Sequence, residues 1–319
     1  MSHYLSKFLG MFCAHLIAFL PMNSATAQST VSSAGAPAAK VPLQPGASDM
    51  QFSNGVINRF SLAKMESFVI VPAAKVDPQR RWVWVVPSSM VFTKHEKNPL
   101  PTRVEYEFYV ESLLAHGFYV AGVNIGASLG SPAGAEAFEK FYEFVINKYQ
   151  LNPKARLIGQ SNGGLMVYAW AFRHPEKVDR ILGIYPSLDL RSWPTLEKVV
   201  GPKSVGNPVF GFQAMSLDEL KKRLPEFNPI DNLKPLADAK VKIFHIHGDS
   251  DHTVPFEPNS GEALRRYRAL GGDMEVLSLP GKGHDPGPGF YGSQKAVDFL
   301  IASLDKGASD SASTNSSAQ

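Results

Sequence analysis

The chain has 319 residues, of which 44% are hydrophobic and 19% charged, and its formal net charge is only +3 at pH 7. This length suits one large α/β domain or two small ones, and the apolar fraction is enough for a sizeable core. Because the small net charge comes without a lysine or arginine cluster outside ordinary helix faces, we expect no nucleic-acid partner.

The first residues carry the pattern of a secretory signal peptide. Lys7 gives a positive start, residues 8–20 are almost entirely apolar, and residues 25–27 form a small-x-small cleavage site. We predict that residues 1–27 are removed after Ala27, which makes the protein secreted or periplasmic and leaves it no stable membrane anchor. The alternative is an uncleaved anchor, although the apolar run is short for a membrane span.

Two further segments lack the periodicity of helices or strands. Residues 28–50 are rich in Ser, Ala, Pro and Gly and predict a flexible linker, and residues 306–319 predict a disordered tail. A single folded domain is therefore expected over residues 51–305. The only cysteine, Cys13, lies in the predicted signal peptide, so the mature protein would have no disulfide, thiolate metal site or cysteine nucleophile.

Strand and helix patterns alternate along the predicted domain. Residues 56–62 and 68–71 predict a hairpin or meander at one edge of a sheet. Further strands are predicted at 81–86, 118–125, 155–159, 181–185, 241–247 and 274–279, and helices at 101–117, 132–149, 165–173, 260–270 and 292–306. This alternation predicts an α/β fold with a mostly parallel central sheet, helices on both faces, and a site at the carboxyl ends of the strands.

Residues 190–235 interrupt this alternation. The segment contains several prolines together with Trp193, Phe210 and Phe212, and it shows no clear strand. One interpretation is a small cap inserted over the site, and the other is a set of connecting helices on the back face of the domain. Substrate specificity would depend on this segment if it is a cap.

A strand, a sharp turn and a helix meet at residues 159–164, whose sequence is Gly-Gln-Ser-Asn-Gly-Gly. A serine nucleophile needs its hydroxyl held clear of the backbone, and a strained elbow between strand and helix does this. Gly159 and Gly163 leave the room that such an elbow needs, and the start of the helix favours negative charge near Ser161. The alternative is that Ser161 merely caps the helix while the glycines serve packing.

A serine hydroxyl becomes a nucleophile when a base accepts its proton and a third group orients the base. His284 follows the last strand in a loop rich in glycine and proline, so we predict that it is the base. Asp251 follows the strand before it and is the predicted acid, with Asp249 as its rival. Asp189 and Asp285 are weaker candidates for the same role.

The tetrahedral intermediate of acyl transfer carries an oxyanion that needs two donors already in place. We predict that the backbone N–H of Asn162, directly after the nucleophile, is one of them. The second should come from the loop after the strand at 81–86. Because Pro87 has no N–H, Ser88 is preferred and Ser89 is the alternative.

Two other features could indicate a bound group. His245 and His247 alternate on one strand and share a face, as a metal pair would. No third ligand is evident, so ordinary hydrogen bonds inside the core are the favoured interpretation, and we predict no metal site. Residues 126–134 are glycine-rich before a helix, but the G-x-G-x-x-G order is absent, so we expect no nucleotide and no other cofactor.

With these motifs, the chain resembles the α/β-hydrolase superfamily, most closely its carboxylesterase, dienelactone-hydrolase-like and prolyl-oligopeptidase-like branches. The resemblance covers about residues 55–305 and rests on the 159–164 elbow, the 248–255 segment with Asp251, and the loop of His284. It implies an α/β-hydrolase fold and serine hydrolysis. The lipase-type His-Gly-Gly-Gly oxyanion loop is absent, and at this length we expect no N-terminal propeller of a full oligopeptidase.

These observations predict an exported serine hydrolase that cleaves carboxylic esters through a Ser-His-Asp triad and an acyl-enzyme. Its substrate would be a small-molecule or oligomeric ester. One alternative is a peptidase that uses the same triad, as in the prolyl-oligopeptidase-like branch. The other is a non-catalytic binding protein built on a hydrolase scaffold.

Overall fold

The computed structural model describes residues 50–86, 102 and 104–303. All of them belong to one compact unit of the chain, Pro42–Gln319. The predicted signal peptide with Cys13, the predicted tail and all but the last residue of the predicted linker lie outside the described residues. None of the helices within the described ranges has the length and apolar character that crossing a membrane requires.

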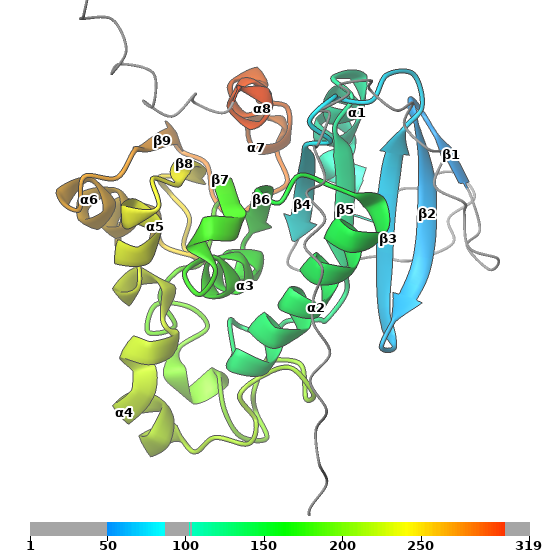
Figure 1. The fold of residues 1–319 in the computed structure, drawn as a ribbon. Coiled ribbons are helices and arrows are strands. Elements are labelled where there is room, and N and C mark those ends of the chain that lie inside the picture. Colours follow the sequence, from blue (N-terminus) through cyan, green and yellow to red (C-terminus); the bar gives the residue numbers. More distant parts are fainter. Residues whose placement is uncertain (1–49, 87–101, 103, 304–319) are drawn as a thin grey trace, which may run out of the picture. The chain divides into compact units, whose positions relative to one another are not determined.

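The described strands form one sheet whose order is β1-β2-β3-β5-β4-β6-β7-β8-β9. They are β1 (Met50–Phe52), β2 (Gly55–Leu62), β3 (Met65–Pro72), β4 (Trp82–Val86), β5 (Tyr119–Val123), β6 (Ala155–Gln160), β7 (Val178–Ile184), β8 (Lys242–Gly248) and β9 (Met274–Leu279). β1, β2 and β3 pair antiparallel, whereas all pairs from β5 across to β9 are parallel. The predicted edge hairpin and the mostly parallel sheet are both confirmed (Figure 1).

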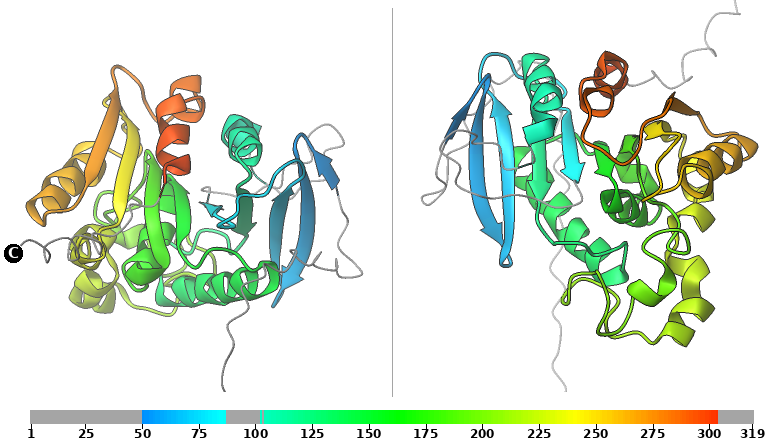
Figure 2. Two further views of the ribbon diagram at one scale, coloured as in Figure 1. Left: turned by 45° about the horizontal axis from the view of Figure 1, so that its top comes forward. Right: turned by 180° about the vertical axis from the view of Figure 1, so that it is seen from behind.

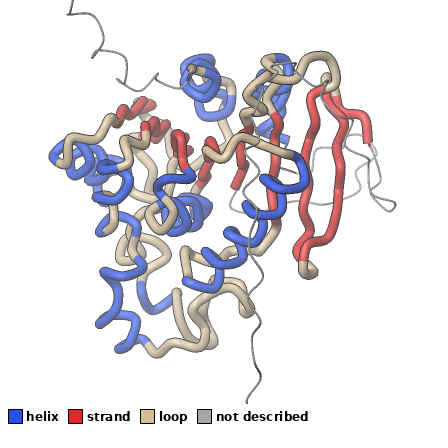
Figure 3. Tube along the Cα trace, in the orientation of Figure 1, coloured by secondary structure: helices blue, strands red, loops and turns tan. Residues whose placement is uncertain are grey.

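The helices lie on both faces of this sheet, as predicted (Figures 2 and 3). One face packs against α2 (Pro132–Tyr149), α3 (Asn162–Ala171), α5 (Lys234–Asp238) and α6 (Glu262–Ala269). The other packs against α1 (Glu107–Ala115), α7 (Pro288–Tyr291) and α8 (Gln294–Ile301). The remaining helices are α4 (Leu217–Phe227), the 3₁₀ turns η1 (Val104–Tyr106), η2 (Pro175–Lys177), η3 (Leu196–Lys198) and η4 (Pro229–Asp231), and the π-helical turn η5 (Glu257–Gly261).

The alternation of side chains along β4 explains why this strand is apolar throughout. Trp82 and Trp84 point into the core under α2 and α3, whereas Val83 and Val85 point into the core under α1 and α8. A strand covered on both faces has no solvent side that would favour polar residues. β4 lies between β5 and β6, so the chain continues from β4 to opposite sides of the sheet. This makes a topological switch point between β4 and β6, and open α/β sheets bind their ligands at the carboxyl ends of the strands at such a point.

Some element ends differ from those predicted. α3 begins at Asn162 and not at residue 165, because the strand-to-helix turn is completed at Ser161 and the two following glycines are already helical. The first helix was predicted from residue 101, but its regular part begins at Glu107 after the 3₁₀ turn η1. β1 begins at Met50, the last residue of the predicted linker. α7 was not predicted, because its four residues are too few to show a helical period.

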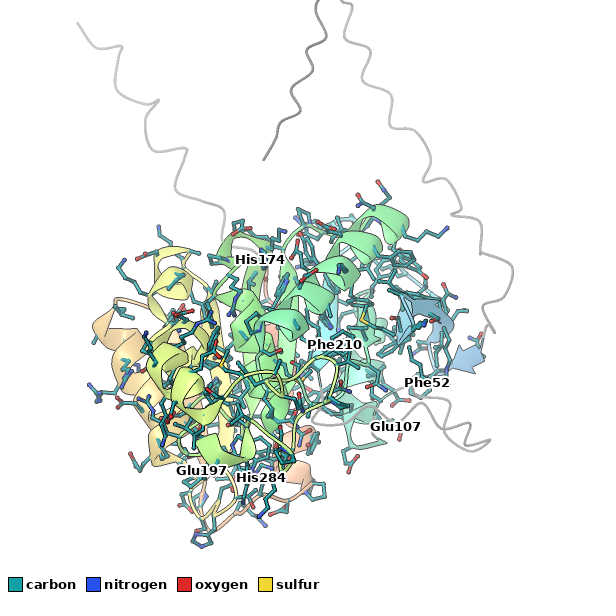
Figure 4. All side chains as sticks on the ribbon, turned by 90° about the horizontal axis from the view of Figure 1, so that it is seen from below. Phe52, Glu107, His174, Glu197, Phe210 and His284 are labelled. Atoms are coloured by element: carbon teal, nitrogen blue, oxygen red, sulfur yellow. The ribbon has the colours of Figure 1, made fainter. Side chains whose placement is uncertain are left out.

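Residues 190–235 contain helices and turns but no strand, as predicted. Their apolar residues, including Leu190, Phe212 and Leu220, form a separate core with Leu165 at the start of α3. Ser131, the N-cap of α2, donates a hydrogen bond to the carbonyl of Phe210. The segment lies beyond the carboxyl ends of the parallel strands (Figure 1), and Figure 4 views it from that side. This position is the one a cap requires, and its role as a cap stays a prediction.

Candidate active site

Ser161 sits at a strained turn between β6 and α3. Its backbone angles are φ 54° and ψ −123°, which a residue with a Cβ rarely adopts. The strain is held by hydrogen bonds: the N–H of Ser161 donates to Ile184 at 3.1 Å, and its carbonyl accepts from Gly164 and Ser187 at 2.9 Å each. The turn therefore directs the side chain of Ser161 away from the backbone that holds it.

Glycines let the elbow close. A Cβ on Gly159 would lie 3.1 Å from the carbonyl oxygen of Gly163 and 3.2 Å from the Cα of Gly164. A Cβ on Gly164 would lie 2.6 Å from the Cβ of Pro186 and 2.7 Å from the carbonyl oxygen of Ser187. A side chain at Gly159 would be crowded, in keeping with the predicted need for space there, and the same prediction for Gly163 stays a prediction. Gly164 is a further position, where the loop after β7 comes too close for a side chain.

The structure brings Ser161, His284 and Asp251 together at the carboxyl edge of the sheet. Nε2 of His284 lies 2.9 Å from Oγ of Ser161, and Nδ1 of His284 lies 2.7 Å from Oδ2 of Asp251. The three residues come from the loops after β6, β9 and β8, whose parallel strands end at the same edge. Figure 4 labels His284, whose side chain is 18% exposed, whereas that of Asp251 is fully buried.

Asp251 is surrounded by N–H donors. Its Oδ1 accepts from the backbone of Thr253 and of Val254 at 2.9 Å each, while Oδ2 faces His284. Burial alone raises the pKa of the Asp251 carboxyl. The N–H groups of His247, His284 and Val254 outweigh burial and hold this pKa well below its ordinary value of 3.8. The carboxylate is therefore ionised wherever the protein is folded at neutral pH.

The other candidate acids have other partners. Asp249 is exposed and accepts the N–H of Gly281 at 2.7 Å. Asp189 pairs with Arg191 at 2.8 Å, and Asp285 accepts a hydrogen bond at 2.9 Å within its own turn. Asp249 thus has the role of a turn residue, although its place in the sequence made it the rival of Asp251.

The loops after β8 and β9 are bound to each other. The N–H of Ser250 donates to the carbonyl of Lys282 at 3.0 Å, and Asp249 bridges to Gly281 as described above. A Cβ on Gly248 would collide with the carbonyl group of Lys282, so a glycine is required where the loops approach. These contacts fix the loop of Asp251 relative to the loop of His284.

Tyr185 belongs to the site and was not predicted. Its ring centroid lies 4.3 Å from that of His284, at an interplanar angle of 52°. Its hydroxyl lies 2.5 Å from that of Tyr291 and accepts a hydrogen bond from Gln160 at 3.2 Å. Its φ of 34° is also strained. The sequence did hold a signal, because Tyr185 directly follows β7, whose carboxyl end lies between those of β6 and β8.

The predicted oxyanion donors are only partly within the described residues. Asn162 is the first residue of α3, so its N–H belongs to the positive end of the helix beside Ser161. Val86, the last residue of β4, pairs with Gly159 at the elbow. Ser88 and Ser89 lie outside the described residues. The roles of Asn162 and Ser88 stay predictions.

His245 and His247 share a face of β8, and both are fully buried. Both lie within hydrogen-bond distance of Oγ of Ser260, at 2.9 and 2.7 Å. The other ring nitrogens contact the hydroxyl of Tyr168 at 2.8 Å and the carbonyl of Val254 at 2.9 Å. The interpretation as hydrogen-bonded core histidines is confirmed. Within the described part of the chain, no three His, Cys, Asp or Glu side chains gather as metal ligands would.

In a comparison with known proteins, the chain matches the model of one protein family. The model of the prolyl oligopeptidase family matches residues 134–306, more than half of the chain. This range includes Ser161, Asp251 and His284. Among curated proteins, none matches the sequence significantly.

Several solved structures share the fold. A puromycin hydrolase is 16% identical with a TM-score of 0.53, over 73% of this chain and 36% of its own. A puromycin-hydrolyzing peptidase of Mycobacterium tuberculosis is 14% identical with a TM-score of 0.59, over 79% of this chain and 40% of its own. An acetyl xylan esterase from Paenibacillus sp. R4 is 15% identical with a TM-score of 0.54, over 81% of this chain and 88% of its own. The chain thus spans well under half the length of the first two enzymes.

Proposed function

Because the chain belongs to the prolyl oligopeptidase family and is a serine hydrolase of the α/β-hydrolase fold, we propose that it cleaves carboxylic esters with Ser161, His284 and Asp251 as its catalytic triad. The observation that carries the proposal is the unbroken contact from Oγ of Ser161 through the imidazole of His284 to Oδ2 of Asp251, at 2.9 and 2.7 Å. A non-catalytic scaffold has no need for a strained serine at the end of this contact.

In the first half of the reaction, Oγ of Ser161 attacks the carbonyl carbon of the ester while its proton passes to Nε2 of His284. The carbonyl oxygen becomes an oxyanion, which the N–H of Asn162 and a second donor, proposed to be the N–H of Ser88, stabilise. The C–O bond to the leaving alcohol then breaks, and His284 returns the proton to that alcohol. The product is an acyl-enzyme on Ser161.

In the second half, water takes the place of the alcohol. His284 accepts a proton from the water, whose oxygen bonds to the acyl carbon, and the second oxyanion forms in the same place. Collapse of this intermediate breaks the bond to Ser161, which regains its proton, and the carboxylic acid leaves. Asp251 stays ionised throughout and holds Nδ1–H of His284, consistent with the lowered pKa of its carboxyl.

Esters are proposed over peptides for a chemical reason and a structural one. An alcohol leaves a tetrahedral intermediate more readily than an amine, so an ester demands less from the protonation of the leaving group. The acetyl xylan esterase also shares the fold over 88% of its own length. The second candidate is peptide hydrolysis, which the family and the similarity to a puromycin-hydrolyzing peptidase support.

The test compares Ser161→Ala with the parent on an aryl ester and on short aminoacyl amides. For the ester, kcat should fall by about 10⁴-fold or more, because the acyl-enzyme can no longer form. Ser61→Ala, at an exposed position of β2, is the matched control and should keep full activity. Equal ester turnover by parent and Ser161→Ala contradicts the mechanism, and a clear preference of the parent for amides replaces the ester with a peptide.

We also propose that the protein is exported. The support is the pattern of residues 1–27, with its positive start, apolar run and small residues at 25 and 27. N-terminal sequencing of the protein recovered outside the cytoplasm should then begin at Gln28. Recovery of the protein in the cytoplasm with Met1 retained contradicts export.

A further inference from the structure

A second buried histidine faces the carboxylate of Asp251 from behind. Nε2 of His247 lies 2.9 Å from the carbonyl oxygen of Val254 and 3.5 Å from Oδ2 of Asp251. Val254 in turn donates its N–H to Oδ1 of Asp251 at 2.9 Å. The carbonyl of Val254 is therefore bound by the ring of His247, and its N–H is bound by the carboxylate of Asp251.

The contacts continue from His247 to the helix that carries the nucleophile. Nδ1 of His247 lies 2.7 Å from Oγ of Ser260, and Nδ1 of His245 lies 2.9 Å from the same oxygen. Nε2 of His245 lies 2.8 Å from the hydroxyl of Tyr168, on α3 seven residues after Ser161. Each of these side chains is at most 1% exposed. A continuous buried path thus connects α3 with Asp251.

With a neutral His247, the carbonyl at one end of the path sets the direction of every hydrogen bond. The carbonyl of Val254 can only accept, so Nε2 of His247 carries a hydrogen and donates it. In a neutral imidazole the other nitrogen accepts, so the hydroxyl of Ser260 donates to Nδ1 of His247. The oxygen of Ser260 then accepts from Nδ1–H of His245, whose Nε2 accepts the hydroxyl hydrogen of Tyr168.

The hydrogen bond from Tyr168 to His245 requires that both side chains are uncharged. Burial, reinforced by the neighbouring His247, lowers the pKa of His245 from 6.5 to about 3. Burial also raises the pKa of Tyr168 well above its ordinary value of 10.0. His245 is therefore uncharged and Tyr168 retains its hydrogen at neutral pH, so the hydroxyl of Tyr168 donates and Nε2 of His245 accepts.

We propose that His247 is a positioning residue for Asp251, and that Tyr168, His245 and Ser260 lock it in the tautomer with hydrogen on Nε2. The Nε2–H holds the turn that binds Oδ1 and faces Oδ2, the oxygen that receives Nδ1–H of His284. The carboxylate then cannot rotate when His284 gains a proton, and its basicity is limited so that the proton stays on His284. This inference rests on the catalytic roles proposed for Asp251 and His284.

The test replaces His247 by Phe, which removes both ring nitrogens, and by Gln, which keeps an N–H donor near the position of Nε2. For His247→Phe we expect kcat on an aryl ester to fall by about tenfold or more with little change in KM, as for other losses of a partner that orients a ligating or catalytic group. His247→Gln should recover most of that loss. His116→Phe, at an exposed position after α1, is the matched control and should keep full activity.

A pH profile separates positioning from a purely structural role. The titratable groups that face His247 are Asp251, from the loop after β8, and His245, across Ser260 on its own strand. Without the N–H of His247, Asp251 becomes a stronger acceptor and favours the imidazolium form of His284. The acidic limb of kcat/KM should therefore move to higher pH in His247→Phe and return in His247→Gln.

Ser260→Ala covers the case in which His247→Phe does not fold. It removes only the hydroxyl that fixes the tautomer and should shift the acidic limb in the same direction with a smaller fall in kcat. A folded His247→Phe or Ser260→Ala protein with the parent's kcat and acidic limb overturns the inference. So does an activity loss that follows thermal stability alone, with no shift of the limb and no rescue by Gln. If Ser161→Ala is inactive in the same assay, such a result removes this inference and leaves the proposed function intact.

Discussion

The two ends of β6 hold buried charge in different ways. At the amino end, Arg156 pairs with Asp179 at 2.7 Å, and Arg180 at the start of β7 pairs with the same carboxylate at 2.8 Å. Both arginines also donate to carbonyls at the end of α8, where cations stabilise a helix. At the carboxyl end, β6 leads to Ser161, and the buried carboxylate of Asp251 contacts backbone N–H groups and two imidazole rings.

This difference separates stability from function. At the amino end each ion has a permanent partner, and although burial and the nearby Arg180 lower the pKa of Arg156 to about 10, it remains a cation at neutral pH. At the carboxyl end, Asp251 is paired with His284, whose charge changes in every proposed cycle, and strained backbone is found at Ser161 and Tyr185. Changes at the first cluster should affect folding, and changes at the second should affect turnover.

The largest effect is expected from Asp251→Asn. The amide keeps the shape of the carboxylate but can no longer hold His284 in the tautomer that accepts the serine proton, so kcat should fall by about 10⁴-fold. The folded structure should persist by circular dichroism. Asp249→Asn is the matched control two residues earlier, and it should lose little activity because an asparagine there can still accept the N–H of Gly281. Equal losses in the two variants would mean that the acid has been misassigned.

The opposite pattern is expected for Asp179→Asn at the amino end. Two buried arginines would lose their shared carboxylate, and the free energy of unfolding should fall by about 3 kcal/mol or more. The kcat of the folded fraction should stay that of the parent. Asp238→Asn, which breaks an exposed ion pair with Lys234, is the control and should leave denaturant unfolding nearly unchanged. A loss of kcat without a loss of stability in Asp179→Asn contradicts the separation.

A pH titration of stability tests the neutral state of His245. Its pKa is about 3 in the folded protein and ordinarily 6.5. The unfolded chain therefore binds a proton below pH 6.5 that the folded chain refuses, and stability is complete above pH 6.5 and is lost as the pH falls toward 3. Between pH 6 and 4, this histidine should lower the free energy of unfolding by up to about 1.4 kcal/mol for each pH unit of acidification. The pKa of Asp251 lies below that window.

The measurement is urea unfolding of the parent, His245→Gln and His252→Gln across this pH range. The free energy of unfolding should depend less steeply on pH in His245→Gln than in the parent. In His252→Gln the dependence should be that of the parent, because His252 is exposed. An unchanged slope in His245→Gln would show that His245 is not held neutral by the fold.

The smallest effect is expected from Tyr185→Phe. The substitution removes the hydroxyl that contacts Tyr291 and Gln160 but keeps the ring beside His284. We expect kcat to change by less than about threefold and the free energy of unfolding to fall by about 1 kcal/mol. Tyr185→Leu, which removes the ring, should lower kcat further. If the Phe and Leu variants have the same kcat, the ring does not help to position His284.

The sequence predicted the parts of the site that depend on chain order. Ser161, Asp251 and His284 each follow a strand of a parallel sheet, and parallel strands bring their carboxyl ends to one edge whatever the distance along the chain. The sequence left Asp249 as the rival of Asp251, because both follow the same strand and only tertiary packing shows that Asp251 is buried and Asp249 exposed. The α2 helix was predicted over its full length, because its apolar residues recur at helical spacing on one face.

The roles of His247 and Tyr185 could not be predicted from the sequence, because they depend on contacts between side chains of different helices, strands and loops. His247 was recognised as a buried strand histidine, but its position behind Asp251 follows from the turn at Val254 and from Ser260 on η5, which no local pattern reveals. Tyr185 contacts His284 through a strained backbone that propensities would exclude. These contacts are set by tertiary packing, which overrides local preference at functional sites.

The most direct test of the central claim is covalent labelling of the parent protein by a fluorophosphonate, followed by tryptic mass mapping. The account predicts one label on Ser161, in the tryptic peptide 157–173, and a much slower reaction in His284→Gln, which lacks the base that activates the serine. A label on another residue, or equal rates in the parent and His284→Gln, would contradict it.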